Sequence, residues 1–221
     1  MSLPAISPYP LPGPDRLPAN RAAWRVHPDR AVLLVHDMQR YYLRPYPEGT
    51  DPLRGVLDHI AALVDACRSA RVPVVYTAKP GGMDPVRRGL ELHFWGSGMR
   101  AAADHTAIDA RIAPGVDDLV VTKTRYSAFV GTDLAARLAE WGRDQLVVTG
   151  VYTHIGCLLT AADAFMRDIQ PFLVADATAD FTAEKHRLAL EYAAARCAVV
   201  TSTDQVLAAV STARVDVETG G

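Results

Sequence analysis

Short runs of apolar residues, many of them β-branched, recur along the chain from residue 31 onward. A continuous apolar run, rather than strict alternation, is typical of a strand that is covered on both faces of its sheet. We therefore predict six buried strands, over residues 31–36, 72–77, 119–122, 145–150, 171–175 and 197–201.

Longer segments with helical periodicity separate these runs, and they predict helices over residues 52–71, 133–141, 153–167, 183–195 and 203–213. Thr182 and Thr203 stand where two of these helices start, and their hydroxyls are placed to cap the first turn. Gly142 and Gly150 lie at a helix end and a strand end, where the chain must turn. The alternation of strand and helix predicts an α/β fold. We expect a single Rossmann-like, doubly wound domain with a mostly parallel six-stranded sheet and helices on both faces.

The start of the chain is rich in proline: six of the 15 prolines fall within the first 18 residues. Proline fixes φ and lacks a backbone donor, so this segment should form an extended arm rather than a helix or a central strand. We predict that the arm lies over the surface of the domain, against a partner subunit in an oligomer. The expected organisation is an arm at residues 1–30, the domain at 31–213 and a tail at 214–221.

Composition and charge argue against several classes of function. The 221 residues are 49% hydrophobic and carry 23 Lys and Arg against 25 Asp and Glu, a net charge of −2. This balance argues against an electrostatic nucleic-acid binder. No apolar run approaches the roughly 20 residues of a membrane-spanning helix. The N-terminus has no secretory leader, and the three cysteines are too few and too widely spaced for a disulfide framework. We therefore expect a cytoplasmic, enzymatic protein.

Polar residues follow several of the predicted strands. In an open parallel sheet, ligands bind outside the carboxyl ends of the strands. Asp37 and Gln39 follow the first predicted strand, Lys79 follows the second and Lys123 follows the third. Taken singly, Asp37 is equally well explained as a turn residue, and each lysine is better explained as a solvated one. As a pair, Asp37 and Lys123 are stronger candidates for a functional site, because a doubly wound order is expected to place their strands side by side.

Other motifs give no support to metal, nucleotide or serine chemistry. Gly96-Ser-Gly98 resembles part of a dinucleotide fingerprint, but Phe94-Trp95 precedes it instead of a strand. The sequence has no P-loop, His-Glu-x-x-His or Cys-x-x-Cys motif, and Ser127 lacks the Gly-x-Ser-x-Gly elbow of serine hydrolases. We therefore expect neither a metal nor a cofactor.

Four stretches, together with the proline-rich arm, resemble the isochorismatase-like hydrolases over nearly the whole chain. These stretches are residues 33–40, 123–129, 150–157 and 168–176. Within that family the chain is most similar to the isochorismatases of phenazine and siderophore pathways, and above all to the phenazine type. The resemblance implies the isochorismatase-like fold, a homodimer and chemistry without a cofactor. It also implies a cis peptide bond between Val151 and Tyr152.

The activity that the resemblance implies is hydrolysis of the enolpyruvyl vinyl ether of 2-amino-2-deoxyisochorismate or isochorismate. The products would be pyruvate and a trans-dihydro-hydroxyanthranilate or a dihydroxy-dihydrobenzoate. In this interpretation Asp37 is the general acid that protonates the methylene carbon, and Lys123 orients its carboxyl group. Glycine at position 156 would leave room for the enolpyruvyl group. Because a nearby ammonium lowers the pKa of an acid, we expect the two substrate carboxylates and desolvation to raise the pKa of Asp37 again.

The expected substrate is a chorismate-derived dianion held by polar residues and an aromatic wall. The residues expected to bind it are Gln39, Tyr42, Lys79, Arg88, Trp95, Tyr126 and Tyr152. Arg88 matches a family arginine and can grip a carboxylate with two parallel hydrogen bonds. Lys79 stands where related enzymes carry glutamine. It could bind a substrate carboxylate, pair with Asp37 or point to solvent.

Two other functions stay open at this stage. Amidases of the wider family use an Asp–Lys–Cys triad whose cysteine aligns with Gly156, so an amidase here would have to use Cys157. That residue is one position further on, about 100° around a helix, and is better explained as a small core residue. A non-catalytic protein that docks a carrier domain is the other alternative.

Overall fold

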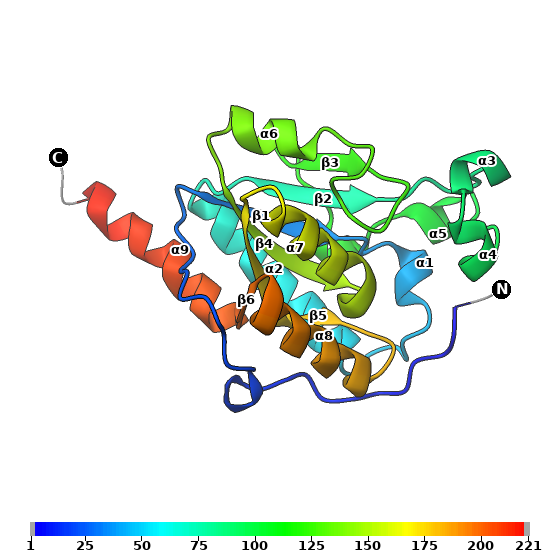
Figure 1. Ribbon diagram of the computed structural model, residues 1–221, viewed down its shortest axis with the longest axis horizontal. Helices are drawn as coiled ribbons and strands as arrows, with labels where there is room; N and C mark the ends of the chain where they lie inside the picture. Colours follow the sequence, from blue (N-terminus) through cyan, green and yellow to red (C-terminus); the bar gives the residue numbers. More distant parts are fainter. Residues whose placement is uncertain (1–2, 219–221) are drawn as a thin grey trace.

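The computed structural model describes the backbone of residues 3–218 and the side chains of residues 3–211. Its centre is one sheet of six strands in the order β3-β2-β1-β4-β5-β6, all of them parallel (Figure 1). The strands are β1 (Ala31–His36), β2 (Val74–Ala78), β3 (Leu119–Thr122), β4 (Gln145–Val151), β5 (Gln170–Ala179) and β6 (Val199–Thr201). This architecture confirms the predicted doubly wound α/β class.

Helices cover both faces of the sheet. On one face, α2 (Leu53–Ser69) packs on β5 and against α9 (Thr203–Glu218). On the other face, α7 (Leu158–Phe165) and α8 (Ala183–Arg196) pack on β5 and on each other, and α6 (Leu134–Glu140) joins the same core. All five helices match segments that periodicity predicted.

The strand β1 explains why a continuous apolar run is the right signal for this sheet. Leu33 and Val35 belong to the core cluster beneath α2, whereas Val32 and Leu34 belong to the cluster beneath α6, α7 and α8. Every residue of β1 is buried. Since side chains alternate between the two faces of a strand, a sheet that is covered twice needs apolar residues at every position.

Several local features differ from the predictions. The predicted helix at 153–167 begins instead with one turn of π-helix, η3 (Thr153–Cys157), before α7. Helix α9 continues to Glu218 rather than ending at residue 213, and residues 219–221 of the predicted tail lie outside the described residues. Short helices occupy segments where none was predicted: α1 (Arg40–Leu43), α3 (Pro85–Arg88), α4 (Glu91–Trp95), α5 (Ala103–Thr106), η1 (Pro14–Arg16) and η2 (Ala110–Ile112).

The two predicted helix caps have different outcomes. The hydroxyl of Thr182 accepts a hydrogen bond from the backbone N–H of Lys185, as predicted. At α9 the cap is Ser202, whose hydroxyl accepts from the N–H of Gln205. The hydroxyl of Thr203 instead donates to the carboxylate of Asp176 at 2.9 Å. The prediction at Thr203 was therefore wrong by one residue.

The N-terminal segment runs over the surface of the domain as an extended chain that is interrupted by η1 (Figure 1). Ile6 and Tyr9 anchor it, because both side chains are buried in the core beneath α2. The Tyr9 hydroxyl accepts a 2.7 Å hydrogen bond from the backbone N–H of Asp180. Within the part of the chain that the structure describes, no helix is long and apolar enough to span a bilayer.

One topological expectation was wrong. The strands that carry Asp37 and Lys123 were predicted to be neighbours, but β2 lies between β1 and β3. The two residues nevertheless meet, because Lys123 follows β3 with a side chain long enough to cross the end of β2.

Candidate active site

A cavity opens at the carboxyl ends of β1 to β4, where the doubly wound fold is expected to bind a ligand. It is lined by Leu3, His36, Asp37, Tyr41, Tyr42, Lys79, Arg88, Glu91, Trp95, Lys123, Tyr126, Val151, Tyr152, Ile155, Gly156 and Phe181. Nine of the ten residues that the sequence singled out are in this set, and Gln39 is the exception. Residues far apart in the sequence therefore converge on one edge of the sheet.

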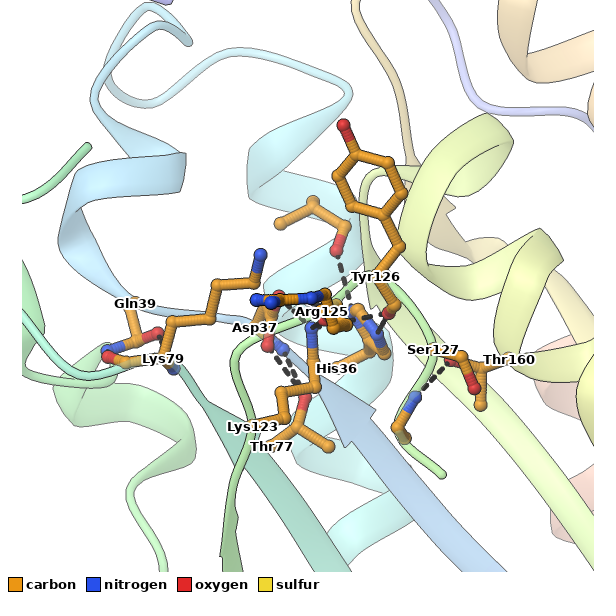
Figure 2. A network of polar contacts seen from close by, with 12 residues as sticks. His36, Asp37, Gln39, Thr77, Lys79, Lys123, Arg125, Tyr126, Ser127 and Thr160 are labelled. Atoms are coloured by element: carbon orange, nitrogen blue, oxygen red, sulfur yellow. Dashed lines mark hydrogen bonds and ion pairs between the residues drawn. The ribbon is translucent and has the colours of Figure 1, made fainter. Parts of the chain in front are cut away.

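Asp37 is the first residue after β1 and lies almost completely buried. Its backbone is left-handed, with φ of 51°, a conformation that aspartate tolerates better than most residues. Oδ2 lies 2.7 Å from Nζ of Lys123, and Oδ1 accepts a 2.7 Å hydrogen bond from the hydroxyl of Thr77 (Figure 2). That hydroxyl accepts in turn from the N–H of Asp37 at 3.1 Å. Both carboxylate oxygens are thus held in place by donors.

Lys123 is fully buried, and the contacts of its ammonium group account for all three of its N–H donors. Besides Asp37, Nζ donates to the carbonyl oxygens of Arg125 at 3.0 Å and Tyr126 at 3.3 Å. An ammonium has three donors. Lys123 is therefore placed to orient and charge-balance the carboxylate rather than to bind a substrate directly.

The surroundings of Asp37 have opposing effects on the pKa of its carboxyl group. Burial alone would raise the pKa of this carboxyl group, but the Lys123 ammonium, His36 and Lys79 act in the other direction and leave the pKa below its usual value. In the absence of a bound anion the residue is a carboxylate near neutral pH. Acid catalysis by Asp37 then requires that the bound substrate shift this balance.

Gly156 is adjacent to an imidazole, which gives a reason for the glycine that the sequence did not show. An added Cβ would lie 2.1 Å from Cε1 of His36. Gly156 also lines the cavity, and that it leaves room for the substrate stays a prediction. His36 is buried, with Nδ1 3.0 Å from the carbonyl oxygen of Val151 and Nε2 3.2 Å from that of Tyr126. Burial lowers the pKa of His36 to about 4, so the ring is neutral near pH 7. The protein itself excludes a side chain at this position.

Cys157 has the surroundings of a core residue. Its side chain is fully buried in the cluster beneath α7, and its only hydrogen-bond partner among the described residues is the carbonyl of Thr149, at 3.9 Å. Burial raises the pKa of its thiol well above 9, with a smaller contribution from Asp37. It does not line the cavity. A nucleophilic role for Cys157 is therefore contradicted, because a nucleophile must be exposed and ionisable.

Lys79 and Arg88, both expected to be available for substrate, share a buried counter-ion. Nζ of Lys79 lies 2.7 Å from each carboxylate oxygen of Glu91, and Nη1 of Arg88 lies 3.0 Å from Oε2. All three side chains are at least nine-tenths buried. Lys79 thus neither points to solvent nor pairs with Asp37 at contact distance. Glu91 is a pocket residue that the sequence interpretation missed.

Gln39 has a structural position one layer behind the cavity. Its side-chain amide donates to the carbonyls of Lys79 and Thr106, and its Oε1 accepts from the backbone N–H of Lys79 at 2.8 Å. These bonds fix the chain that follows β2. The expectation that Gln39 contacts substrate is not met by this geometry, and its contribution is to hold the backbone of Lys79.

An aromatic wall encloses the remaining side of the cavity. The rings of Tyr152 and Phe181 lie 4.2 Å apart, and the indole N–H of Trp95 donates to the hydroxyl of Tyr126 at 2.6 Å. Tyr42 completes the wall, since its carbonyl accepts from the Tyr152 hydroxyl at 2.7 Å. The peptide bond between Val151 and Tyr152 is cis, as the resemblance implied.

Seven of the lining residues were not among the predicted site residues: Glu91, described above, and Leu3, His36, Tyr41, Val151, Ile155 and Phe181. Leu3 comes from the proline-rich arm, Tyr41 precedes the predicted Tyr42, and Phe181 follows β5. His36 could have been suspected from its place next to Asp37. Among the described residues no group of three or more His, Cys, Asp or Glu side chains is arranged to hold a metal ion.

The chain is similar to known proteins over most of its length. The chain is 53% identical to phenazine biosynthesis protein PhzD1 of Pseudomonas aeruginosa over 205 residues, which cover 93% of this chain and 98% of that protein. It is 47% identical to an isochorismatase of Bacillus subtilis over 218 residues, covering 99% of this chain and 70% of that protein.

Solved structures share the fold more widely. A cysteine hydrolase from Pseudomonas syringae pv. phaseolicola superposes with a TM-score of 0.78 at 26% identity, over 89% of this chain and 98% of that one. The model of the isochorismatase domain matches residues 31–205, which include every strand and all but one of the residues that line the cavity. On these grounds the chain belongs to the isochorismatase family.

Proposed function

We propose that this protein hydrolyses the enolpyruvyl ether of 2-amino-2-deoxyisochorismate or isochorismate, with Asp37 as the general acid. The observation that carries the proposal is a buried carboxyl group, held by Lys123 and Thr77, that faces a cavity with basic and aromatic walls. No cysteine or serine side chain is among the described residues that line this cavity. The names of the relatives, an isochorismatase and a phenazine biosynthesis protein, support the same chemistry.

The proposed reaction begins with proton transfer to carbon. The carboxyl proton of Asp37 adds to the terminal methylene of the vinyl ether, whose π electrons form the new C–H bond. The carbon next to the ether oxygen becomes an oxocarbenium ion. Water adds to that carbon and returns a proton to the Asp37 carboxylate. The resulting hemiketal breaks its bond to the ring oxygen, and proton transfer to that oxygen gives pyruvate and a ring alcohol.

Substrate binding raises the pKa of Asp37, which lies below its usual value in the free site. A carboxylate near Asp37 raises its pKa, because a like charge disfavours ionisation. Closure of the cavity by the substrate also removes water, which acts in the same direction. Each oxygen of a carboxylate can accept two hydrogen bonds, so the contacts with Lys123 and Thr77 leave room for the catalytic proton. Lys123 then stabilises the carboxylate that forms after proton transfer.

The homodimer and the cytoplasmic location are further parts of this proposal. Large apolar side chains on the contacting helices α7 and α8 are exposed, a feature typical of subunit interfaces. These side chains are Leu159, Phe165, Met166, Leu188 and Tyr192. Light scattering should give twice the chain mass of 23.9 kDa. A monomer at micromolar concentration would contradict the dimer without affecting the hydrolase.

Pyruvate release from both candidate substrates tests the activity. We expect the parent protein to release pyruvate and the matching ring alcohol from at least one of them. Asp37→Asn keeps the size of the side chain and one of its two acceptor oxygens, but it cannot donate the carboxyl proton. Its kcat should fall by about 10²- to 10⁴-fold, the usual range for general acid catalysis. A folded Asp37→Asn protein with normal turnover would refute the assignment of Asp37, and a folded parent protein that cleaves neither ether would refute the function.

A further inference from the structure

The cluster of Lys79, Arg88 and Glu91 has no part in proton transfer, yet it forms one side of the same cavity. Burial of three charged groups is costly, because each loses its hydration. A neutral glutamine and an apolar residue would close this part of the wall without that cost. The presence of a buried carboxylate between two cations therefore calls for a functional explanation.

The cluster lines the cavity and retains unused hydrogen-bonding capacity. Glu91 accepts from Lys79 at both oxygens and from Arg88 at Oε2, which uses three of about four acceptor positions of a carboxylate. Arg88 uses two of its five N–H groups, on Glu91 and on the carbonyl of Gly96. An incoming ligand thus meets one anionic acceptor position beside several cationic donors.

We infer that Glu91, with Lys79 and Arg88, is a specificity subsite for an ammonium group on the ring carbon next to a carboxylate. An aliphatic amine is protonated near neutral pH. Its N–H groups complement the open acceptor position of Glu91, while the adjacent carboxylate complements Arg88 and Lys79. This inference rests on the proposed function, and it selects the 2-amino substrate over its 2-hydroxy analogue.

A hydroxyl group satisfies this subsite less completely. It can donate one hydrogen bond to Glu91, but it carries no positive charge to strengthen that bond. A hydrogen bond between two charged groups is stronger than one from a neutral donor, so the amino substrate should be bound more tightly. The three residues come from the end of β2 and from the short helices α3 and α4, which Figure 1 shows beside each other (Figure 1). Figure 2 shows Lys79 extending toward the space above Asp37, so the subsite adjoins the acid.

The first experiment compares kcat/KM for the two substrates. In the parent protein the amino substrate should be preferred. In Glu91→Gln the ratio of amino to hydroxy kcat/KM should fall by about 10- to 100-fold, the effect expected for one hydrogen bond between charged groups. The matched control is Glu140→Gln, which removes a mostly exposed carboxylate on α6 and should leave the ratio unchanged.

A second variant separates recognition from charge balance. Glu91→Gln alone leaves Lys79 buried without its partner, which could disturb the cavity for any ligand. In Lys79→Gln/Glu91→Gln both charges of this pair are gone, and the net charge of the cluster is unchanged because Arg88 remains. If Glu91 binds the ammonium, this double variant still lacks amino preference. If the double variant recovers the parent ratio, Glu91 is only a counter-ion of Lys79 and the inference is wrong.

Binding of small ring acids gives a readout that does not depend on turnover. We expect 2-aminocyclohexane-1-carboxylate to compete with substrate more strongly than 2-hydroxycyclohexane-1-carboxylate, and to lose this advantage in Glu91→Gln. A parent protein that prefers the hydroxy substrate, or a Glu91→Gln variant with an unchanged ratio, overturns the inference while ether hydrolysis stands. A folded parent protein that cleaves neither substrate refutes the proposed function, and the inference with it.

Discussion

The imidazole of His36 occupies the space directly over the α-carbon of Gly156, so that a Cβ at 156 would lie 2.1 Å from its Cε1. The ring is held from both sides, by the carbonyl of Val151 and the carbonyl of Tyr126. The backbone of His36 is enclosed in the same way, since a Cβ at Gly150 would lie 2.2 Å from its carbonyl oxygen. Gly150 has φ of 104°, which also favours glycine. Two glycines thus fit around one histidine next to the proposed acid.

This contact predicts that Gly156 and His36 are energetically coupled. Gly156→Ala should destabilise the protein by about 1–3 kcal/mol, the usual cost of overpacking a core. In a His36→Ala background the same change should cost clearly less, because the clashing ring is absent. Urea unfolding of the parent, the two single variants and the double variant measures the coupling. Equal costs of Gly156→Ala in both backgrounds would show that the methyl group is accommodated in another way.

The Asp37–Lys123 pair predicts a stability effect that depends on pH. Lys123→Met removes the ammonium that lowers the pKa of Asp37, so that pKa rises and the carboxylate becomes unfavourable in its buried site. Breaking a buried ion pair in this way costs about 3–5 kcal/mol. A group with a raised folded pKa destabilises the protein increasingly as pH rises through that value. The loss measured by urea unfolding should therefore be larger at pH 8 than at pH 5.

The double variant Asp37→Asn/Lys123→Met is the control for this effect. It contains neither charge, so its loss of unfolding free energy should be smaller than that of Lys123→Met at pH 8 and nearly independent of pH. In the single variant Lys123→Met, the descending limb of the pH–rate profile should lie at higher pH than in the parent, because Asp37 keeps its proton to higher pH. A descending limb at the same pH as in the parent would show that the group that titrates in the profile is not Asp37.

Most of the sheet was predictable because its inner strands are buried on both faces. The edge strand β3 was also predicted to be buried, but Val120 is 46% exposed and only Val121 of this strand is buried. Every residue of β1 and β4 is buried, so each leaves a continuous apolar run in the sequence. The order of the strands carries no such signal, and the expected pairing of β1 with β3 was accordingly wrong. The residues that follow β1, β2 and β3 were still a good guide to the site, since the carboxyl ends of parallel strands share one edge whatever their order.

The site residues that were predicted wrongly or missed have a common physical explanation. Glu91 lies 12 positions after Lys79 in a segment of short helices without periodicity, so nothing in the sequence links the two charges. Gln39 was expected at the substrate because it follows β1, but the left-handed turn at Asp37 precedes it and its amide binds the backbone of Lys79. Which side chains turn toward a cavity depends on loop conformation, which residue type alone does not specify.

Lys79 predicts a second pH effect, on substrate affinity. Burial lowers the pKa of its ammonium group to about 8, and Lys123 adds to this shift, while Asp37 and Glu91 oppose it. The positive charge is therefore lost as pH rises through about 8, and KM for an anionic substrate should increase there. In Lys79→Gln no charge is present to titrate, so KM should be higher than in the parent below pH 8 and flat across that range. A parent KM that is constant from pH 7 to 9 would contradict this role.

Because its three cysteines are buried, the folded protein should resist thiol reagents. Cys67, Cys157 and Cys197 are all buried, and burial raises the pKa of Cys67 to about 12 and that of Cys157 well above 9. Since the thiolate is the reactive form, a disulfide reagent at pH 8 should label none of them over minutes, and pyruvate release should persist. Val116→Cys, at a site that is 98% exposed, is the matched control and should label at once. Rapid labelling of a native cysteine with parallel loss of activity would instead point to thiol catalysis.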